Sequence, residues 1–419
     1  MADLLSRLGA ADRWVLERLC SEGDAWVVGG WVRDSLSGLN PGEMDIATTL
    51  RPAQIAELFA RTVPVGAAFG TVLVLPDDGV WQADSDAQVG PSWEVTTLRS
   101  DGTYGDGRRP DEVEFGDDIV EDLARRDFTI NAMAMDPRTG EVIDPFGGRD
   151  DLEAAIIRAV GDANERIGED GLRIMRAFRF LDAGEDGARK LDGDLETAIR
   201  ESLSMLEKVS SERKWAELAR VMQGRMRAEV LARMADAGLL SAVLDETPIR
   251  IDGPFSGVPA VDLAILCRGD SRSGVDLAAH LKILLRLSND ETRTITFLHD
   301  LQNDDLVAEN TVLRRYNAAL SDQMKAEAAA YFGAAGETYA EAAASIPPPR
   351  AGNRPLVGGE ALMQATELEA GPRLGRLKGW LHRRQIEDDL ATAEEVLSLL
   401  ESIDWQGEEP ESWPALAWP

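Results

Sequence analysis

Cysteine is almost absent from this chain of 419 residues, since Cys20 and Cys267 are the only two. Two thiols so far apart in the sequence exclude a disulfide framework and a thiolate metal site. No run of about 18 apolar residues occurs, which excludes a helix that crosses a bilayer. Residues 1–20 predict an amphipathic helix, and Asp3 and Asp12 within it are unlike a secretory or transit signal. We therefore expect a cytoplasmic protein.

Positive charge is also in short supply. The chain has 44 basic and 75 acidic residues, a formal net charge of -31, and only six of its cations are lysines. Such an acidic chain at first argues against a nucleic-acid partner, because phosphate binding needs a basic surface. The other 38 cations, however, are arginines. Arginine is the better bidentate ligand for phosphates and base edges, so these cations suit a nucleotide or an RNA.

The sequence changes character at about residue 150. Before it, short apolar runs alternate with turn-rich stretches, which predicts strands mixed with helices. After it, long stretches of Ala, Leu, Glu and Arg with helical spacing predict an almost wholly helical remainder. Clear breaks lie at 251–259 and 345–355, and the end, 403–419, is acidic and rich in Pro and Trp. We expect an α+β domain, then all-α domains, then a loose tail. The alternative for this tail is that its three tryptophans dock on a surface.

A glycine turn and a pair of acids lie close together in VVGGWVRDSLSGLNPGEMDIATTL. The turn at Gly29 and Gly30 lets the backbone approach a phosphate, and a helix start and Arg33 add donors. Glu43 and Asp45 are two residues apart in a predicted strand, so both carboxylates point to one side, as a pair of Mg²⁺ ions requires. Each feature alone is an ordinary turn or an exposed strand. Together they predict a triphosphate site beside a metal site.

A second strand, WEVTTLR, carries Glu94, which is either a third carboxylate near the metal pair or an exposed strand residue. The glycine-rich loop after it contains Asp106, Arg108 and Arg109. We expect this loop to close on a nucleotide or on an RNA end.

The run RRDFTINAMA then supplies donors for phosphate and acceptors for ribose hydroxyls. The side chains that supply them are those of Arg125, Arg126, Asp127 and Asn131. For Asp127 the alternative interpretation is an ion pair between domains.

The segment RIGEDGLRIMRAFRF predicts a helix that begins at Asp170 or just after it. Asp170 and Arg173 are then neighbours, an acceptor beside a donor, which matches the edge shared by adenine and cytosine. Uracil and guanine present the donor and the acceptor in the reverse order along that edge. The alternative is a surface salt bridge worth about 0.3–0.5 kcal/mol. Arg176 and Arg179 extend the basic stripe, whereas Phe180 is predicted to be core.

In this order the motifs resemble the class II tRNA nucleotidyltransferases, the CCA-adding enzymes, and the related bacterial poly(A) polymerases. The similar runs are GGWVRD, E-x-D-I-A-T-T, EVTTLR, YGDGRRPD, RRDFTINAMA, DPFGG, EDGLRIMRAFRF and, more weakly, SSERKWAEL, LVGGEALM and GPRLGRL. The resemblance implies a head of the DNA polymerase beta-like nucleotidyltransferase type, followed by helical domains. The expected divisions are a catalytic head (1–150), a base-recognising neck (151–220), a body (221–345), a tRNA-contacting tail (346–402) and the loose end (403–419).

The resemblance further implies template-independent addition of CCA to the 3' end of tRNA from CTP and ATP, with release of pyrophosphate. It makes Glu43 and Asp45 the catalytic ligands of two Mg²⁺ ions. It also implies a set of nucleotide-binding residues, which are Gly29, Gly30, Arg33, Arg126, Asp127, Asn131, Asp170 and Arg173. Arg176 of the basic stripe is predicted to join them. Glu43 stands where the family usually has Asp, Phe69 replaces a usual histidine, and the segment 76–92 is longer than expected.

One local reversal of charge lies near the C-terminus. Residues 371–386 contain no acid and hold five cations, Arg373, Arg376, Lys378, Arg383 and Arg384. In so acidic a chain this segment is the predicted contact with the tRNA backbone. The alternative is a helix whose cations pair with acidic neighbours.

Other activities remain open on the sequence alone. A poly(A) polymerase shares the head motifs, and specialised A-adding or CC-adding enzymes are close relatives, although the intact DGRRPD loop disfavours addition of CC only. Glu43 also leaves open a non-catalytic RNA-binding relative. A phosphohydrolase of the HD type is rejected, because its metal site needs more histidines than His280, His299 and His382. No protein partner or membrane association is expected.

Overall fold

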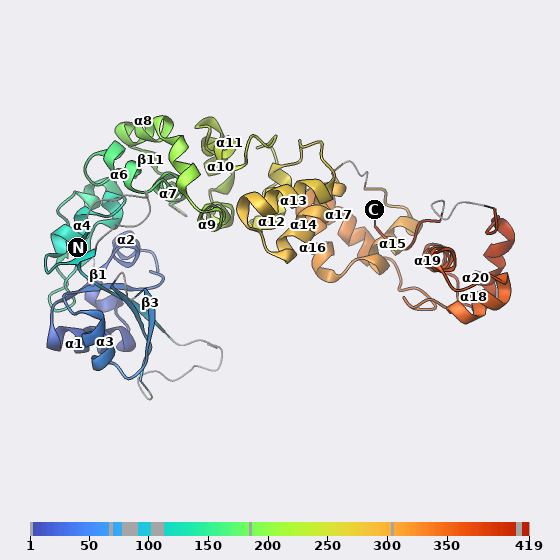
Figure 1. Ribbon diagram of the computed structural model, residues 1–419, viewed down its shortest axis with the longest axis horizontal. Coiled ribbons are helices and arrows are strands. Elements are labelled where there is room, and N and C mark those ends of the chain that lie inside the picture. The colour runs from blue at the N-terminus through green and yellow to red at the C-terminus, as the bar shows by residue number, and fades with distance from the viewer. Residues whose placement is uncertain are drawn as a thin grey trace. The chain divides into compact units, whose positions relative to one another are not determined.

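A computed structural model describes most of this chain, and it forms two compact units, Met1–Glu246 and Thr247–Pro419 (Figure 1). The residues that the structure describes are 3–66, 70–77, 91–101, 113–183, 187–302, 306–407 and 413–418. No helix among them is both long enough and apolar enough to cross a membrane. Phe69, most of the 76–92 segment and the loop residues Asp106, Arg108 and Arg109 lie outside the described residues.

The head is built on a seven-stranded mixed sheet in the order β3-β4-β5-β2-β1-β8-β9. Its strands are β1 (Ala25–Val28), β2 (Asp45–Thr48), β3 (Thr62–Gly66), β4 (Thr71–Val74), β5 (Trp93–Thr97), β8 (Ala134–Met135) and β9 (Val142–Ile143). A separate two-stranded ladder joins β6 (Arg99–Asp101) to β7 (Val113–Phe115). The helices of the head are η1 (Leu4–Arg7), α1 (Ala10–Glu22), α2 (Gly30–Leu36), α3 (Pro52–Leu58), α4 (Ile119–Ala124) and η3 (Thr129–Asn131).

Both faces of this sheet are buried, and strand β1 shows why its sequence is apolar throughout. Ala25 and Val27 point into the core that α1 and α3 cover, on the face where Figure 1 shows these two helices together. Trp26 and Val28 point to the opposite core, which includes Leu123 of α4. Because successive strand residues face opposite ways, a central strand covered on both sides has no polar face. The rigid sheet fixes the ends of β1 and β2, where the candidate site lies.

The neck consists mainly of short helices, as predicted. They are α5 (Gly148–Glu153), α6 (Ala163–Glu169), α7 (Leu172–Arg179), α8 (Gly193–Glu201), η5 (Leu203–Lys208), α9 (Ser211–Gln223), α10 (Arg227–Asp236) and α11 (Leu239–Val243). One departure from an all-α neck is a small parallel ladder of β10 (Ile156–Ile157) and β11 (Lys190–Leu191). Helix α10 packs on α9 and α7, so residues 221–246 join the first unit rather than the expected body.

The second unit is helical. Its elements are α12 (Pro259–Leu266), α13 (Gly274–Leu285), α14 (Asn289–Asp300), α15 (Asn310–Ala319), α16 (Asp322–Phe332), α17 (Ala334–Ala344), α18 (Gly359–Thr366), α19 (Pro372–Glu387), α20 (Ala393–Ser398) and η6 (Leu399–Ser402). The breaks expected at 251–259 and 345–355 lead into α12 and α18. The predicted order of a mixed α/β part followed by helices is confirmed.

Two tryptophans of the segment 403–419 are buried, as the alternative to a loose tail predicts. Trp413 is 1% exposed and belongs to the core around α18 and α19. Trp418 is 7% exposed, and its ring centroid lies 5.0 Å from Tyr316 and 5.9 Å from Tyr339. Burial of such large rings favours an ordered position strongly enough to outweigh the Pro-rich, acidic composition around them.

Candidate active site

The two catalytic candidates meet at one end of the head sheet. Asp45 is the first residue of β2, opposite Val28 on antiparallel β1 and level with Glu94 on parallel β5. Glu43 lies in the turn before β2 rather than in the strand that the sequence predicts. Both Glu43 and Asp45 nevertheless line the same pocket, which has a volume of about 700 Å³.

The carboxylate of Asp45 lies among like charges. Burial raises the pKa of Asp45, and the neighbouring carboxylates of Glu94 and Glu43 raise it further, although Arg126 opposes them. A divalent cation would relieve this repulsion. No group of three or more His, Cys, Asp and Glu ligands is found within the described part of the chain. Mg²⁺ needs no such group, because it keeps several waters and binds through one or two carboxylates plus substrate phosphates. Glu43 and Asp45 facing an open pocket fit that requirement.

The glycine turn leaves no space for a side chain beside Asp45. Gly29 adopts a φ of +70°, a left-handed conformation that favours glycine. A Cβ atom at this position would lie 2.9 Å from Nη1 of Arg126 and 4.0 Å from Oδ2 of Asp45. Glycine therefore lets the Arg126 guanidinium lie directly over the backbone that joins β1 to α2.

A chain of polar contacts runs from the head to the neck. Arg33 Nη1 donates to Asn131 Oδ1 at 2.6 Å, and Asn131 Nδ2 donates to Asp127 Oδ1 at 3.1 Å. Arg176 of α7 then donates from Nε to Asp127 Oδ2 at 2.7 Å. The structure thus gives Asp127 the bridging ion pair that the sequence offered as the alternative to a nucleotide contact. Asn131 likewise uses both ends of its amide within the protein.

Asp127 is 8% exposed, and its charge is stabilised by these partners. Burial alone would raise the pKa of Asp127, but the Arg176 charge and hydrogen bonds from Asn131, Arg176 and the Phe128 N–H hold it at about 2. In the unfolded chain an aspartate has a pKa of about 3.9. Because the folded value is the lower one, the stabilisation is present above about pH 4 and is lost as the pH falls through about 2.

We expect Asp127→Asn to lower the free energy of unfolding by about 2–3 kcal/mol at pH 7, as that difference in pKa implies. The effect should shrink as the pH falls from about 4 towards 2, when wild-type Asp127 also loses its charge. Urea denaturation at several pH values measures it. Glu196→Gln is the matched control, because the ion pair of Glu196 with Arg200 is half exposed and should contribute little. A loss of stability that does not depend on pH would contradict this account.

The predicted base-recognition pair lies at the junction of α6 and α7, where Asp170 and Arg173 both line the pocket. Each has a separate partner: Arg213 of α9 donates to Asp170 Oδ2 at 2.6 Å, and Arg173 pairs with Glu169. Arg173 also donates to the Arg125 carbonyl at 3.0 Å. No direct side-chain contact between Asp170 and Arg173 is recorded among the described residues. Arg213 and Glu169 therefore fix the orientation of the two side chains at the pocket.

Part of the pocket wall, the contribution of α9, was not predicted from the sequence. Glu217 of α9 is 3% exposed and forms ion pairs with Arg179 at 2.6 Å and with Arg220 at 3.0 Å. Arg179, Phe180, Arg213 and Arg220 all line the pocket. The one available signal was Glu217, a charged residue beside Leu218 on the buried face of an amphipathic helix. Such a residue needs partners, and the arginines supply them.

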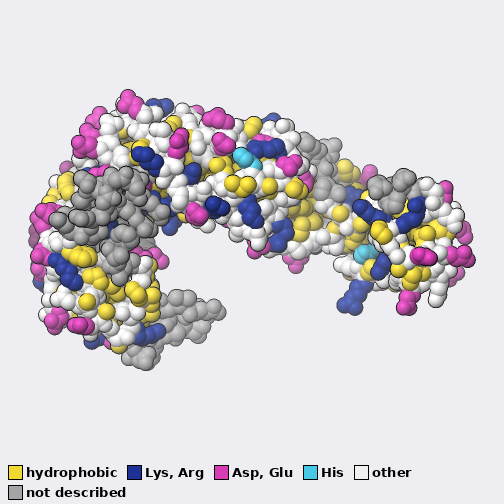
Figure 2. Space-filling view, viewed as in Figure 1, with side chains coloured by type: hydrophobic (Ala, Val, Ile, Leu, Met, Phe, Trp, Pro, Cys, Tyr) yellow, Lys and Arg dark blue, Asp and Glu magenta, His cyan; other side chains and the backbone are white. Residues whose placement is uncertain are grey.

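The five predicted tRNA-contacting cations lie on α19 in the second unit, where they differ in their partners. In Figure 2, Lys and Arg side chains lie both near the C-terminal end of this unit and over its other part, interspersed with Asp and Glu. Arg383 pairs with Glu387 at 2.8 Å and Arg384 with Asp388 at 2.6 Å, as the alternative interpretation expects. Arg373 donates to the Trp405 carbonyl at 3.0 Å. Within the described residues, Arg376 and Lys378 have no recorded ion pair or side-chain hydrogen bond.

Comparison with known proteins gives two family matches. Residues 25–158 match a model described as "Poly A polymerase head domain", and residues 190–249 match one described as "Probable RNA and SrmB- binding site of polymerase A". The CCA-adding enzyme of Geobacillus kaustophilus is 42% identical over 218 residues, 52% of this chain. In that match the chain spans only about half, 50%, of the relative's length.

Longer matches extend the similarity. The crystal structure of Bacillus stearothermophilus CCA-adding enzyme in complex with CTP has a TM-score of 0.74 and 28% identity, covering 93% of this chain and 95% of that one. Thermotoga maritima CCA-adding enzyme complexed with tRNA shares the fold, with a TM-score of 0.63 and 19% identity over 95% and 97% of the two chains. The CCA-adding enzyme of Lactococcus lactis subsp. cremoris is 33% identical over 416 residues, 92% of this chain and 96% of the relative. Since that similarity extends over both units, this chain belongs to the family of CCA-adding enzymes, nucleotidyltransferases that generally use divalent metal ions.

Proposed function

We propose that this protein adds CCA to the 3' end of tRNA from CTP and ATP, without a nucleic-acid template. One observation carries the proposal: a single pocket gathers the acids Glu43 and Asp45, the glycine turn, a set of arginines and the pair Asp170 and Arg173. Known relatives support the substrates, because solved CCA-adding enzymes are complexes with CTP, with ATP and with tRNA. The two free cysteines suit a reducing cytoplasm, where we place the activity.

In the proposed reaction, the 3'-hydroxyl oxygen of the RNA attacks the α-phosphorus of the bound nucleotide. A phosphodiester bond forms as the hydroxyl loses its proton to solvent, the bond between the α-phosphorus and the bridging oxygen breaks, and pyrophosphate leaves. Positioning and charge stabilisation supply most of the catalysis in such transfers, so no covalent intermediate is required. Arg33, Arg126 and Arg176 line the pocket where the triphosphate would lie.

Glu43 and Asp45 would hold the two Mg²⁺ ions of this proposal. When bound, such ions lower the pKa of the attacking hydroxyl and offset charge on the leaving pyrophosphate. The protein's own contribution is to aim two carboxylates into the pocket, with Gly29 leaving space for Arg126 beside them. Asp170 and Arg173 would select the base, since their acceptor and donor match both cytosine and adenine.

The proposal is tested with purified protein, Mg²⁺ and a tRNA that lacks its CCA end. We expect incorporation of labelled CTP first and of ATP only after CTP, with UTP and GTP poorly used. Long tails of A on any RNA would instead favour a poly(A) polymerase. Absence of incorporation would favour a non-catalytic RNA-binding relative and would contradict the proposal.

The tRNA backbone is proposed to contact α19. Because Arg376 and Lys378 have no recorded partner, the double variant Arg376→Ser/Lys378→Ser should raise the KM for tRNA several-fold and leave the KM for CTP unchanged. It should also lower the salt dependence of tRNA binding. Arg293→Ser is the control, since Arg293 is an exposed cation of α14 in the same unit, with 68% of its side chain accessible. An unchanged KM for tRNA would contradict this contact.

A further inference from the structure

An unusual feature of the pocket is one aromatic ring that contacts three guanidinium groups. The Cζ atom of Arg179 lies 4.1 Å from the centroid of the Phe180 ring, that of Arg33 lies 5.0 Å away and that of Arg176 5.3 Å away. All three distances are within the range of a cation–π interaction. Arg33 belongs to α2 of the head, whereas Arg176 and Arg179 belong to α7 of the neck. One side chain therefore connects cations from two parts of the first unit.

The ring of Phe180 is itself held in place. Phe180 follows the last residue of α7 and is 7% exposed. Its ring packs against Phe128 in an edge-to-face arrangement, with centroids 5.8 Å apart. Phe128 is 1% exposed and belongs to the head. A ring fixed in this way is a rigid surface for the arginines rather than a mobile side chain.

Each arginine on the ring is also bound by a carboxylate, so its orientation has two determinants. Arg33 pairs with Asp34 at 2.7 Å. Arg176 pairs with Asp127 at 2.6 Å, and Arg179 pairs with Glu217 at 2.6 Å. The carboxylate fixes one edge of each guanidinium and the ring limits its position, which leaves other N–H groups for the pocket.

The guanidinium groups of this cluster lie close enough to repel one another, although each has a carboxylate partner. Burial and the nearby charges of Arg176 and Arg220 together lower the pKa of Arg179 to about 10, although Glu217 opposes them. Like charges brought this close favour an anion that lies between them. A triphosphate has several anionic oxygens and can contact more than one guanidinium at once.

We propose that Phe180 is a positioning residue for the triphosphate of the incoming nucleotide. Its ring keeps the guanidinium of Arg33 from the head near those of Arg176 and Arg179 from the neck, so that cations from both parts face one anion before it binds. The proposal rests on the proposed function, because it assigns the arginines to that reaction's nucleotide. The burial of Phe180 confirms the expectation that it is core, and the proposal adds a role for its ring.

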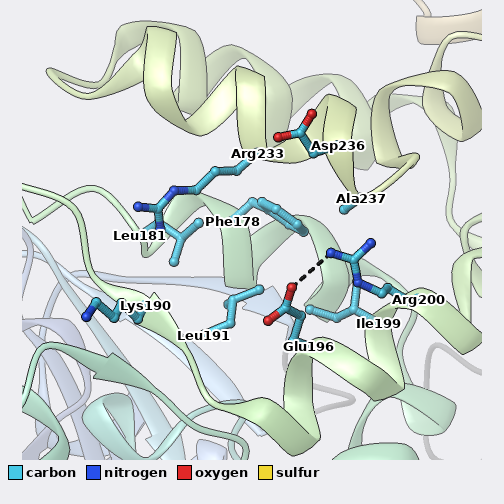
Figure 3. Close-up of a pocket in the computed structure, with 10 residues that line it drawn as sticks. All are labelled: Phe178, Leu181, Lys190, Leu191, Glu196, Ile199, Arg200, Arg233, Asp236 and Ala237. Carbon is cyan, nitrogen blue, oxygen red and sulfur yellow. Dashed lines mark hydrogen bonds and ion pairs between the residues drawn. The ribbon is translucent and has the colours of Figure 1, made fainter.

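Phe178 offers a matched control on the same helix. It is 2% exposed, so its replacement removes a buried aromatic ring of the same size. It lines a separate cavity of about 380 Å³ together with Leu181, Leu191 and Ile199, as Figure 3 shows. No cation–π contact is recorded for Phe178 among the described residues. A general loss of packing in α7 should therefore affect Phe178→Leu and Phe180→Leu alike.

The experiment measures binding of tripolyphosphate with Mg²⁺ to the full chain by calorimetry. We expect Phe180→Leu to weaken binding about tenfold, since the ring contacts of the guanidinium groups are lost. Phe180→Tyr should retain the wild-type affinity because it keeps the ring, and Phe178→Leu should retain it despite a comparable fall in melting temperature. Equal weakening by Phe178→Leu and Phe180→Leu, or no weakening by Phe180→Leu, would overturn the proposal.

A second arm tests whether Phe180 acts through the arginines. In an Arg179→Ala background, Phe180→Leu should weaken tripolyphosphate binding clearly less than in the wild type, because the closest guanidinium is already missing. If Phe180→Leu weakens binding as much in the Arg179→Ala background as in the wild type, Phe180 does not act through Arg179, and the proposal is overturned. In incorporation assays, Phe180→Leu should raise the KM for both CTP and ATP more than it lowers kcat. Failure of the wild type to incorporate any nucleotide would overturn the proposed function, whereas the binding data separately test the role of Phe180.

Discussion

Asp45→Ala is expected to lower kcat for nucleotide incorporation by about a thousandfold or more. Metal ions supply several kcal/mol of transition-state stabilisation in phosphoryl transfer, and about 4 kcal/mol corresponds to a thousandfold in rate. Asp45 begins β2 on the rigid sheet and lines the pocket, so alanine there removes one of the two carboxylates of the proposed metal site. Single-turnover incorporation of CTP at saturating Mg²⁺ measures the effect.

Glu43 provides the informative comparison. Glu43→Ala should impair incorporation strongly as well, whereas Glu43→Asp should retain or raise it, because the shorter side chain matches the usual residue of the family. Glu57→Gln is the matched control, since Glu57 is an exposed residue of α3 that does not line the pocket. Near-normal turnover in Asp45→Ala would contradict the assignment of Asp45 as a metal ligand.

The second large effect concerns the choice of base. Asp170→Ala should reduce the preference for CTP over UTP, expressed as a ratio of kcat/KM values, by about tenfold to a hundredfold. A well-placed pair of hydrogen bonds to a base contributes about 1–3 kcal/mol of discrimination. Competition between labelled CTP and UTP on a tRNA that lacks its CCA end measures this ratio.

Arg213 tests whether the partners of the base-recognition pair contribute. Arg213→Ala removes the 2.6 Å hydrogen bond to Asp170 and should lower the same ratio in the same direction, by less than Asp170→Ala does. The conservative variant Arg213→Lys should recover part of it. Arg200→Ala is the control. Arg200 lies on α8, pairs with Glu196 and lines the separate cavity that Phe178 also lines. A variant of Asp170 that still prefers CTP as strongly as the wild type would contradict the proposed base recognition.

The pocket residues that lie within short motifs were predictable from the sequence. Gly29, Arg33 and Asp45 lie close together in the chain, and local rules for turns and strands bring them together. Asp170 and Arg173 were likewise predictable as neighbours, since a helix start places residues three apart on one face. All of these residues line one pocket.

Contacts between distant segments were not predictable in this way. Arg213 reaches Asp170 from α9, and Phe180 contacts Arg33 of α2, and no local rule relates residues so far apart in the chain. Phe180 illustrates the limit well: its apolar side chain predicts burial, and it is buried, but only tertiary structure shows that guanidinium groups contact its ring. A pattern of hydrophobicity reports burial and says nothing of the neighbour.

Charge at the C-terminus shows a related limit. The acid-free segment 371–386 suggests a basic helix, but Glu387 and Asp388 lie just beyond it, as the alternative of cations paired with acidic neighbours requires. Because a helix brings residues four apart together, these acids reach back to Arg383 and Arg384. The same periodicity leaves Arg376 and Lys378 out of reach of these acids. Net charge alone gave a misleading first indication, and only the distribution of cations points to an RNA contact.

The most direct test of the central claim is to determine the sequence of the tail that the wild-type protein adds. A tRNA without its CCA end is incubated with Mg²⁺ and all four nucleoside triphosphates, and the 3' ends of the products are sequenced. The account predicts the addition of C, C and A in that order, followed by termination. Tails of A alone, termination after CC, or no added nucleotide would contradict it.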